Sequence, residues 1–200
     1  MMHTNEVSSA ESASFSLTLI TTRQTILPKR LSAPGPDAAQ MHALFQAAAA
    51  APDHGELTPW RFVLVPAERR EALADAFAQA LLARDAAATP EQVGQAREKA
   101  FRAPFLALAV ARLGVCEPDI EPMERLVSLG AALQNILLAA HGMGFGASLT
   151  SGQAMRSEAL RLLLKLADGE QAVCCINIGT VTRAKLVRLR PDVTAFVSSL

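Results

Sequence analysis

Residues 126–140 read LVSLGAALQNILLAA, and this run decides how the rest of the chain must fold. Apolar side chains occupy nearly every side of a helix with this sequence, which places the helix in the interior of the protein. We predict a helix over 121–141 that ends at Gly142. Gln134 and Asn135 interrupt the apolar run. A membrane span needs roughly twenty mostly apolar residues, so the pattern indicates a buried helix instead.

Two apolar runs on either side of this helix predict the centre of a sheet. Residues 105–111 are continuously apolar, as a strand buried on both faces is, and residues 172–178 predict another buried strand. We predict shorter strands at 61–65 and 145–149, and the apolar C-terminal residues 193–200 also resemble a strand. Because helices and strands mix without a regular βαβ rhythm, we expect an α+β fold, in which helices cover a small mixed sheet.

Capping signals locate the remaining helices. Asp37 is followed three residues later by Gln40, and Thr89 by Gln92, which is the spacing of a capping box. The first of these helices is closed by Pro52. Further helices are expected over residues 68–84 and 158–166.

The N-terminal residues 1–16 are polar, rich in Ser and free of Lys and Arg. The apolar stretch that follows is too short for a signal peptide. We expect a mobile leader over 1–16, a short helix at 17–22, and a single domain over 17–200.

Composition excludes several classes of partner. Half of the 200 residues are hydrophobic, and the formal net charge is zero. A nucleic acid or an anionic membrane would favour a basic surface, so neither is expected as a partner. The three cysteines, Cys116, Cys174 and Cys175, show neither a disulfide framework nor zinc spacing. They are typical of reduced core thiols, which favours a cytoplasmic location.

A basic loop precedes the first capped helix and contains Arg23, Lys29 and Arg30. Its ordinary interpretation is a solvated surface loop. The functional alternative is a phosphate site, because guanidinium groups match the charge and geometry of a phosphate monoester. Arg183 and Lys185, which follow the strand at 172–178, would add positive charge to such a site.

Two further loops are candidates for contact with a planar ligand. In the loop Ala51-Pro52-Asp53-His54, His54 is either an ordinary exposed histidine or the donor of a ring nitrogen to a ligand. The segment Thr150-Ser151-Gly152 offers hydroxyls, backbone amides and a glycine that permits close approach. The glycines at 142, 144 and 146 follow a helix rather than a strand, which argues against a dinucleotide fingerprint.

No motif in the chain supplies reactive chemistry of its own. The sequence shows no nucleophile elbow, P-loop or cluster of metal ligands, and its four histidines lie far apart. A chain of this kind is typical of a protein whose cofactor carries the chemistry.

Taken together, these segments resemble the nitroreductase family, in particular its compact single-domain members. The resemblance covers about residues 17–198, and the matching segments occur in the family's order. They are Arg30-Leu31, Ala51-Pro52-Asp53-His54, Pro59-Trp60-Arg61-Phe62, Phe101-Arg102-Ala103-Pro104, Ala139-Ala140-His141-Gly142, Thr150-Ser151-Gly152 and Ile178-Gly179-Thr180.

The resemblance implies an α+β sandwich that forms a homodimer with two shared FMN sites. It also implies a ping-pong reaction, in which NAD(P)H reduces the flavin and a nitroaromatic, quinone or enone then takes the electrons. The C-terminal strand is expected to reach onto the partner subunit.

The resemblance assigns cofactor-binding residues by position. Thr22, Arg23 and Gln24 match the opening phosphate motif, although one arginine and a serine hydroxyl of that motif are missing. His54 matches a flavin-contacting residue. Leu149, Thr150 and Ser151, with Gly152 beside them, match a segment along the flavin ring that the partner subunit would supply. Lys29 or Arg30 would lie near the pyrimidine edge, and Arg183 and Lys185 near the phosphate.

We expect the substrate pocket to be lined by residues 83–97 and by residues near Glu124. Alternatives on the same fold are a flavin-dependent dehalogenase and an enzyme that degrades its own flavin. A non-catalytic flavin-binding or regulatory module is the alternative from another class.

Overall fold

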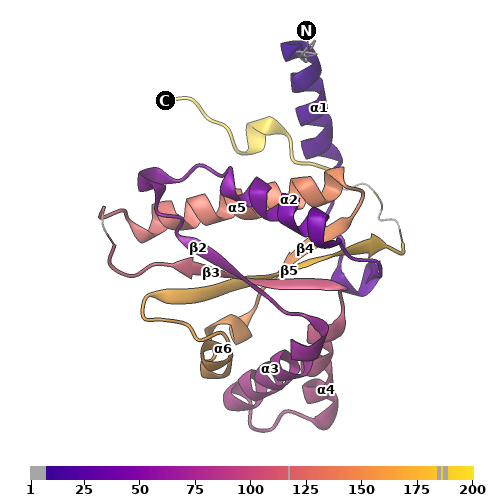
Figure 1. The fold of residues 1–200 in the computed structure, drawn as a ribbon, viewed down its shortest axis with the longest axis vertical. Helices are drawn as coiled ribbons and strands as arrows, with labels where there is room; N and C mark the ends of the chain where they lie inside the picture. The colour runs from indigo at the N-terminus through magenta and orange to yellow at the C-terminus, as the bar shows by residue number, and fades with distance from the viewer. Residues whose placement is uncertain (1–7, 117, 184–185, 187–188) are drawn as a thin grey trace.

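The computed structural model describes residues 8–116, 118–183, 186 and 189–200. These residues form a five-stranded sheet between two layers of helices (Figure 1). The strands are β1 (Leu31–Ser32), β2 (Trp60–Leu64), β3 (Phe105–Arg112), β4 (Gly146–Thr150) and β5 (Glu170–Val181). The long strand β5 is central, because β1, β3 and β4 all pair with it, while β2 pairs with β3.

The predicted fold class is confirmed, but the sheet is not mixed in the way expected. Every pair of named strands is antiparallel. The parallel pairing that the described residues do show is an isolated bridge between Thr25 and Ala147. Strand direction depends on which segments meet in space, so the pattern of apolar residues within each strand does not reveal it.

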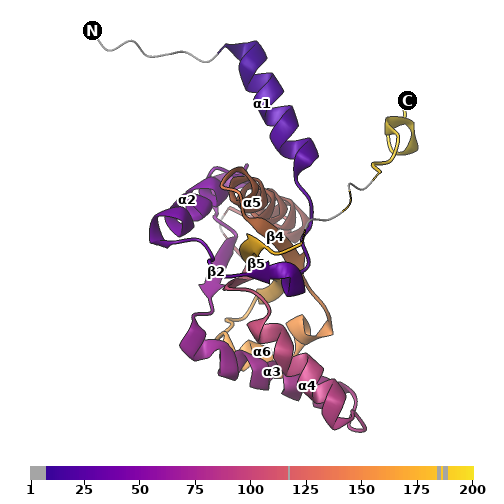
Figure 2. The ribbon, with the colours of Figure 1, turned by 90° about the vertical axis from the view of Figure 1, so that its right-hand side faces the viewer.

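Helices cover both faces of the sheet (Figure 2). Helices α2 (Ala38–Ala49) and α5 (Pro122–Gly142) lie on one face, and α3 (Arg70–Arg84), α4 (Pro90–Glu98) and α6 (Glu158–Leu163) lie on the other. Short 3-10 helices complete the chain. They are η1 (Pro28–Arg30), η2 (His54–Glu56), η3 (Ala67–Arg69), η4 (Lys99–Phe101), η5 (Gln153–Arg156) and η6 (Val193–Ala195).

The position of β3 between the two layers of helices explains why its sequence is continuously apolar. Its side chains alternate between the faces of the sheet. Phe105 and Ala107 belong to the core under α2 and α5, whereas Leu106 and Leu108 belong to the core under α3 and α6. Since helices cover both faces, neither set of side chains meets water. The prediction of a strand buried on both sides is therefore confirmed.

The two predicted capping boxes are present. The carboxylate of Asp37 accepts from the backbone N–H of Gln40 at 2.8 Å, and the Gln40 side chain accepts from the N–H of Asp37 at 2.9 Å. Thr89 and Gln92 make the same reciprocal pair at the start of α4. These bonds satisfy backbone donors that an α-helix leaves free in its first turn.

Both ends of the described chain differ from the sequence prediction. Helix α1 spans Ser9–Thr22, so much of the expected mobile leader is helical, and a capping box between Ser8 and Glu11 starts it. Near the C-terminus, the residues expected to form a strand instead contain η6, which is capped by Asp192. An apolar run forms a strand only where a partner strand is available, and β5 is already paired along both edges in this chain.

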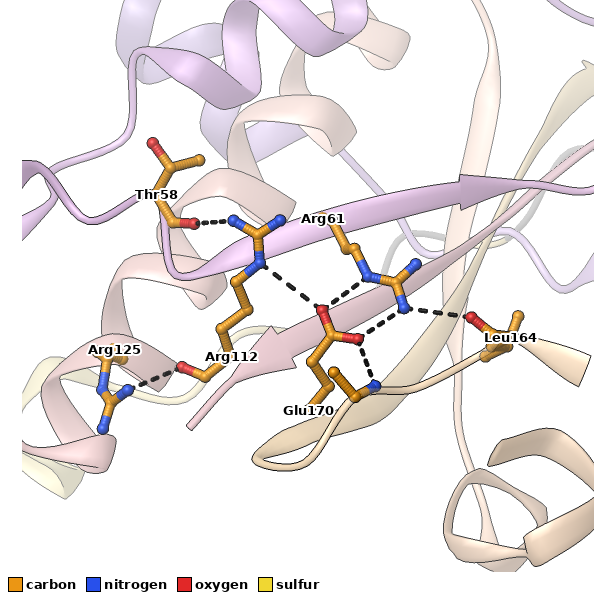
Figure 3. A network of polar contacts seen from close by, with 7 residues as sticks. Thr58, Arg61, Arg112, Arg125, Leu164 and Glu170 are labelled. Carbon is orange, nitrogen blue, oxygen red and sulfur yellow. Dashed lines mark hydrogen bonds and ion pairs between the residues drawn. The ribbon is translucent and has the colours of Figure 1, made fainter. Parts of the chain in front are cut away.

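A network of charged side chains connects the start of β2, the end of β3 and the start of β5 (Figure 3). The guanidinium of Arg61 on β2 donates to both carboxylate oxygens of Glu170 at 2.8 and 2.7 Å, and also to the carbonyl of Leu164 at 3.2 Å. Arg112 on β3 approaches the same carboxylate at 3.7 Å. Hydrogen bonding from Arg61 lowers the pKa of Glu170 to about 2, although partial burial opposes this.

Among the residues that the structure describes, none of the helices is long and apolar enough to cross a membrane. Helix α5, which carries the apolar run of residues 126–140, packs instead against α2 and the sheet.

Candidate functional site

A cavity of about 740 Å³ opens between the end of β4 and the pair of helices α3 and α4. This volume lies within the range of small-molecule and cofactor sites. Of the predicted site residues, Lys29, Thr150, Ser151 and Gly152 line it. The other lining residues are Leu27, Pro28, Phe77, Leu81, Arg84, Gln92, Gln95, Ala96, Glu98, Lys99, Arg102, Gln153, Ala154, Met155, Cys175 and Asn177.

Pairing beside β4 brings two distant segments of the chain to this cavity. The N–H of Ile26 donates to the carbonyl of Ala147 at 3.0 Å, next to the bridge between Thr25 and Ala147. The basic loop therefore runs alongside β4, and both reach the cavity, at Lys29 and Thr150. One chain thus brings both segments to the cavity, and the expectation that the partner subunit supplies the second one to the flavin stays a prediction.

Buried Asn177 on β5 fixes the end of β4. Only 1% of this residue is exposed, and its amide donates to the hydroxyl of Thr150 at 3.0 Å and to the carbonyl of Ser148 at 3.3 Å. The Thr150 oxygen accepts this bond, so Asn177 fixes the position of the hydroxyl beside the cavity. Asn177 was not predicted as a site residue, although the sequence held a signal, since it is the polar residue in the otherwise apolar run 172–178.

The loop after β4 is shaped by Ser151 and Gly152. The hydroxyl of Ser151 donates to the carbonyl of Val173 at 2.8 Å, which holds the loop against β5. Gly152 has φ +154°, a conformation that favours glycine, and no atom lies within 4 Å of where a Cβ would be. The exposed backbone of this loop is therefore open to a ligand in the cavity.

The cysteines at the cavity do not supply a nucleophile. Burial raises the pKa of Cys175, which lines the cavity, to about 12, and that of Cys174 to about 11. Both thiols are therefore protonated at neutral pH, and a protonated thiol is a poor nucleophile and metal ligand. Within the described part of the chain, no group of His, Cys, Asp and Glu side chains is arranged to hold a metal ion.

A second feature lies beyond the start of β4, where two arginines meet. The guanidinium of Arg190 donates to the backbone carbonyl of Arg23 at 3.0 Å. The pKa of Arg23 is lowered, first by burial and second by the positive charge of Arg190. No carboxylate among the described residues forms an ion pair with either guanidinium. These two arginines, called the arginine pair below, are the candidates for binding an anion, because guanidinium groups pair with carboxylates and phosphates.

Arg190 was missed in the sequence, because it lies 167 positions from Arg23. Of the basic residues predicted to assist, Arg183 is exposed just after β5, and Lys185 lies outside the described residues. Arg30 is half-buried in η1 and does not line the cavity. Leu149 is also absent from the lining, and Gln24 is half-buried beside Arg23.

His54 lies at the opposite end of α5 from the arginine pair. Its Nδ1 is 2.6 Å from a carboxylate oxygen of Glu124 in the first turn of α5, whereas Thr22 contacts His141 in the last turn at 2.9 Å. Seventeen residues of helix separate Glu124 from His141, which corresponds to about 25 Å. One chain therefore does not bring His54 and Arg23 to the same small ligand.

Part of the stretch predicted to line the substrate pocket lines this cavity. Arg84, Gln92, Gln95 and Ala96, all within residues 83–97, line the cavity. Glu124 does not, since it pairs with His54.

Comparison with known proteins identifies the family. The model of the nitroreductase family matches residues 20–180, most of the chain. The chain belongs to the nitroreductase family. A Haemophilus influenzae protein that carries the name of an NAD(P)H nitroreductase is 32% identical over 164 residues, or 82% of this chain and 87% of the relative. Membership agrees with the resemblance and places the chain among the NAD(P)H-dependent flavin oxidoreductases.

Solved structures of the nitroreductase family share the fold at low sequence identity. A nitroreductase-like protein from Bacillus cereus superimposes with a TM-score of 0.77 at 19% identity, and the match covers 92% of this chain and 95% of that one. An FMN- and NADPH-dependent nitroreductase from Sphingopyxis sp. strain HMH gives a TM-score of 0.70 at 18% identity, covering 92% and 98% of the two chains.

Proposed function

We propose that the protein is an FMN-dependent oxidoreductase that uses NAD(P)H to reduce small nitroaromatic, quinone or enone acceptors. The observation that carries the proposal is the arrangement around β4. Arg23 and Arg190, which form no ion pair with a described carboxylate, lie beyond one end of this strand, and the cavity with its open backbone loop lies at the other. Five extended residues span about 17 Å. FMN has a matching layout, because a ribityl chain separates its phosphate from its ring.

The residues present fit this cofactor. Arg23 and Arg190 are the side chains that would hold the phosphate, since their positive charges meet no carboxylate of the described chain. Lys29 lines the cavity and supplies positive charge for the pyrimidine edge of the ring. The hydroxyl of Thr150, oriented by Asn177, and the backbone beside Gly152 provide donors next to the ring.

The position of His54 supports a homodimer with shared sites. Because His54 lies at the far end of α5 from Arg23, it reaches a flavin site only if that site belongs to a second copy of the chain. Helix α1 adds support, since its side chains Phe15, Leu17 and Ile20 are exposed apolar groups on an element that projects from the layers (Figure 2). Exposed apolar groups gathered on one element are typical of an interface.

The chemistry divides between cofactor and protein. Bound FMN supplies hydride transfer, from the nicotinamide and then to the acceptor in ping-pong order. The protein binds and orients the reactants, and its three cysteines are free. Because burial keeps the Cys175 thiol protonated, we do not expect this cysteine to react, and the chemistry is assigned to the flavin.

The first experiment is an absorption spectrum of the purified protein from 300 to 550 nm, taken before and after anaerobic addition of NADPH. Flavin bands that NADPH bleaches would support the proposal. A colourless protein that stays colourless when FMN is supplied would refute it and favour the non-catalytic module.

The arginine site is tested by the FMN affinity of the Arg23→Ala variant. Removing a charged partner of the phosphate is expected to raise the Kd for FMN by about 30-fold, which corresponds to a loss of about 2 kcal/mol of binding free energy. Arg156→Ala is the control, because Arg156 is exposed on η5 and does not line the cavity. Equal affinity of the wild type and the Arg23 variant would remove Arg23 from the phosphate site.

A further inference from the structure

The wall of the cavity formed by α3 and α4 carries an excess of positive charge. Four basic side chains line the cavity, Lys29, Arg84, Lys99 and Arg102, against a single carboxylate, that of Glu98. Glu98 is already paired with Arg102 at 3.1 Å. Within the described chain, Arg84 and Lys99 form no hydrogen bond or ion pair through their side chains.

The carboxylates on the same two helices are engaged elsewhere. Glu71 and Asp75 of α3 both bind Arg97, which does not line the cavity. Glu91 at the start of α4 accepts a hydrogen bond from Gln95 at 3.2 Å. Asp85 accepts from the backbone N–H of Ala87. The charges that could have neutralised the wall therefore have other partners.

Apolar side chains line the same cavity as these two cations. Phe77, Leu81 and Arg84 follow one another along one side of α3, at spacings of four and three residues. Ala96 and Lys99 come from the facing segment α4–η4. The wall thus combines a flat aromatic and aliphatic surface with positive charge, and this combination matches an aromatic molecule that carries an anionic group.

We propose that Arg84 and Lys99 form an anion subsite on this wall, which selects substrates that carry a carboxylate, sulfonate or phosphate group. The inference rests on the proposed function and adds a substrate class to it. Lys29 comes from η1 rather than from α3 or the segment α4–η4, and it is the cation assigned to the flavin. The anionic group belongs either to an aromatic electron acceptor or to NADPH, whose 2′-phosphate is absent from NADH.

The test compares two acceptors of nearly equal shape, 4-nitrobenzoate and its neutral analogue 4-nitrobenzamide. The flavin of the holoenzyme is reduced first, so that oxidation by each acceptor is measured alone. The variants are Arg84→Gln and Lys99→Gln. The control is Arg69→Gln, which removes an exposed charge at the start of α3, away from the cavity. Reduction of the oxidised enzyme by NADPH and by NADH is measured for the same proteins.

Each variant is expected to lower the rate constant with 4-nitrobenzoate by about fivefold at low salt, and that with 4-nitrobenzamide by less than about twofold. The difference should shrink in 0.5 M salt, because these side chains are exposed and salt screens them. A selective loss with NADPH relative to NADH would equally support the subsite and assign its anion to the 2′-phosphate. Equal effects on charged and neutral partners in both half-reactions would overturn the proposal.

A binding measurement separates this inference from the proposed function. Calorimetric titration of the oxidised protein with benzoate and with benzamide needs no turnover. The subsite would be supported, even if no acceptor is reduced, by a wild-type protein that binds benzoate more tightly than benzamide. The variant that combines Arg84→Gln with Lys99→Gln should lose this preference. Failure to bind FMN would count against the proposed function alone, whereas equal affinity for benzoate and benzamide would count against the subsite alone.

Discussion

Replacing Glu170 by glutamine should remove a measurable part of the protein's stability. The side chain of Glu170 is 11% exposed, and it is held by Arg61, whose side chain is 28% exposed (Figure 3). Its pKa falls from 4.5 to about 2, chiefly through the hydrogen bond from Arg61. A difference of this size corresponds to about 3 kcal/mol in favour of the ionised carboxylate. After a discount for partial exposure, we expect Glu170→Gln to lower the free energy of unfolding by about 2 kcal/mol at pH 7.

The pH dependence of this stability difference shows whether the charge of Glu170 causes it. A carboxylate whose folded pKa is below its unfolded pKa contributes its full stability above about pH 5 and loses it as the pH falls toward the folded value. The difference in the free energy of unfolding between the wild type and Glu170→Gln should therefore shrink between about pH 5 and pH 2. At pH 2.5 it should be below about 1 kcal/mol.

The assay is urea unfolding followed by circular dichroism, at a fixed protein concentration because the stability of the proposed dimer would depend on concentration. Asp168→Asn is the matched control. Asp168 also pairs with an arginine, Arg161, at 2.9 Å, but its carboxylate is fully exposed, and such a pair contributes little. A difference between wild type and Glu170→Gln that stays constant from pH 7 to pH 2.5 would refute the charge argument and point to packing.

Three other substitutions test the scaffold around the cavity. Arg70 is buried and donates to four backbone carbonyls, so Arg70→Met should cost about 3 kcal/mol in urea unfolding, and an unchanged midpoint would contradict this. A Cβ on Gly179 would lie 2.6 Å from the ring of Pro104, so Gly179→Ala should lower the melting temperature by several degrees, which thermal denaturation will show. Asp37→Ala should cost about 1 kcal/mol through loss of the cap on α2, whereas Asp37→Asn, which keeps the capping oxygen, should cost less in the same assay.

The candidate site could be predicted only in part, because its residues meet through long-range contacts. The motif around Thr150 was found because hydroxyls and a glycine after a short strand are a local pattern, and this segment does line the cavity. Arg190 and Asn177 were not found. Arg190 approaches Arg23 across most of the chain, and Asn177, although it is the polar residue in the run 172–178, gives no sign in the sequence of which partner its amide meets.

The sequence by itself determined the elements whose signals are local. The apolar run of α5, the capping boxes at Asp37 and Thr89, and the continuous apolar strand β3 were predicted, because each depends on neighbours within a few residues. Only the tertiary structure decided which strands pair and in which direction, and where the basic loop lies relative to β4. It also placed His54 at the far end of α5 from Arg23. These relations arise from the packing of distant segments, which no pattern of neighbouring residues records.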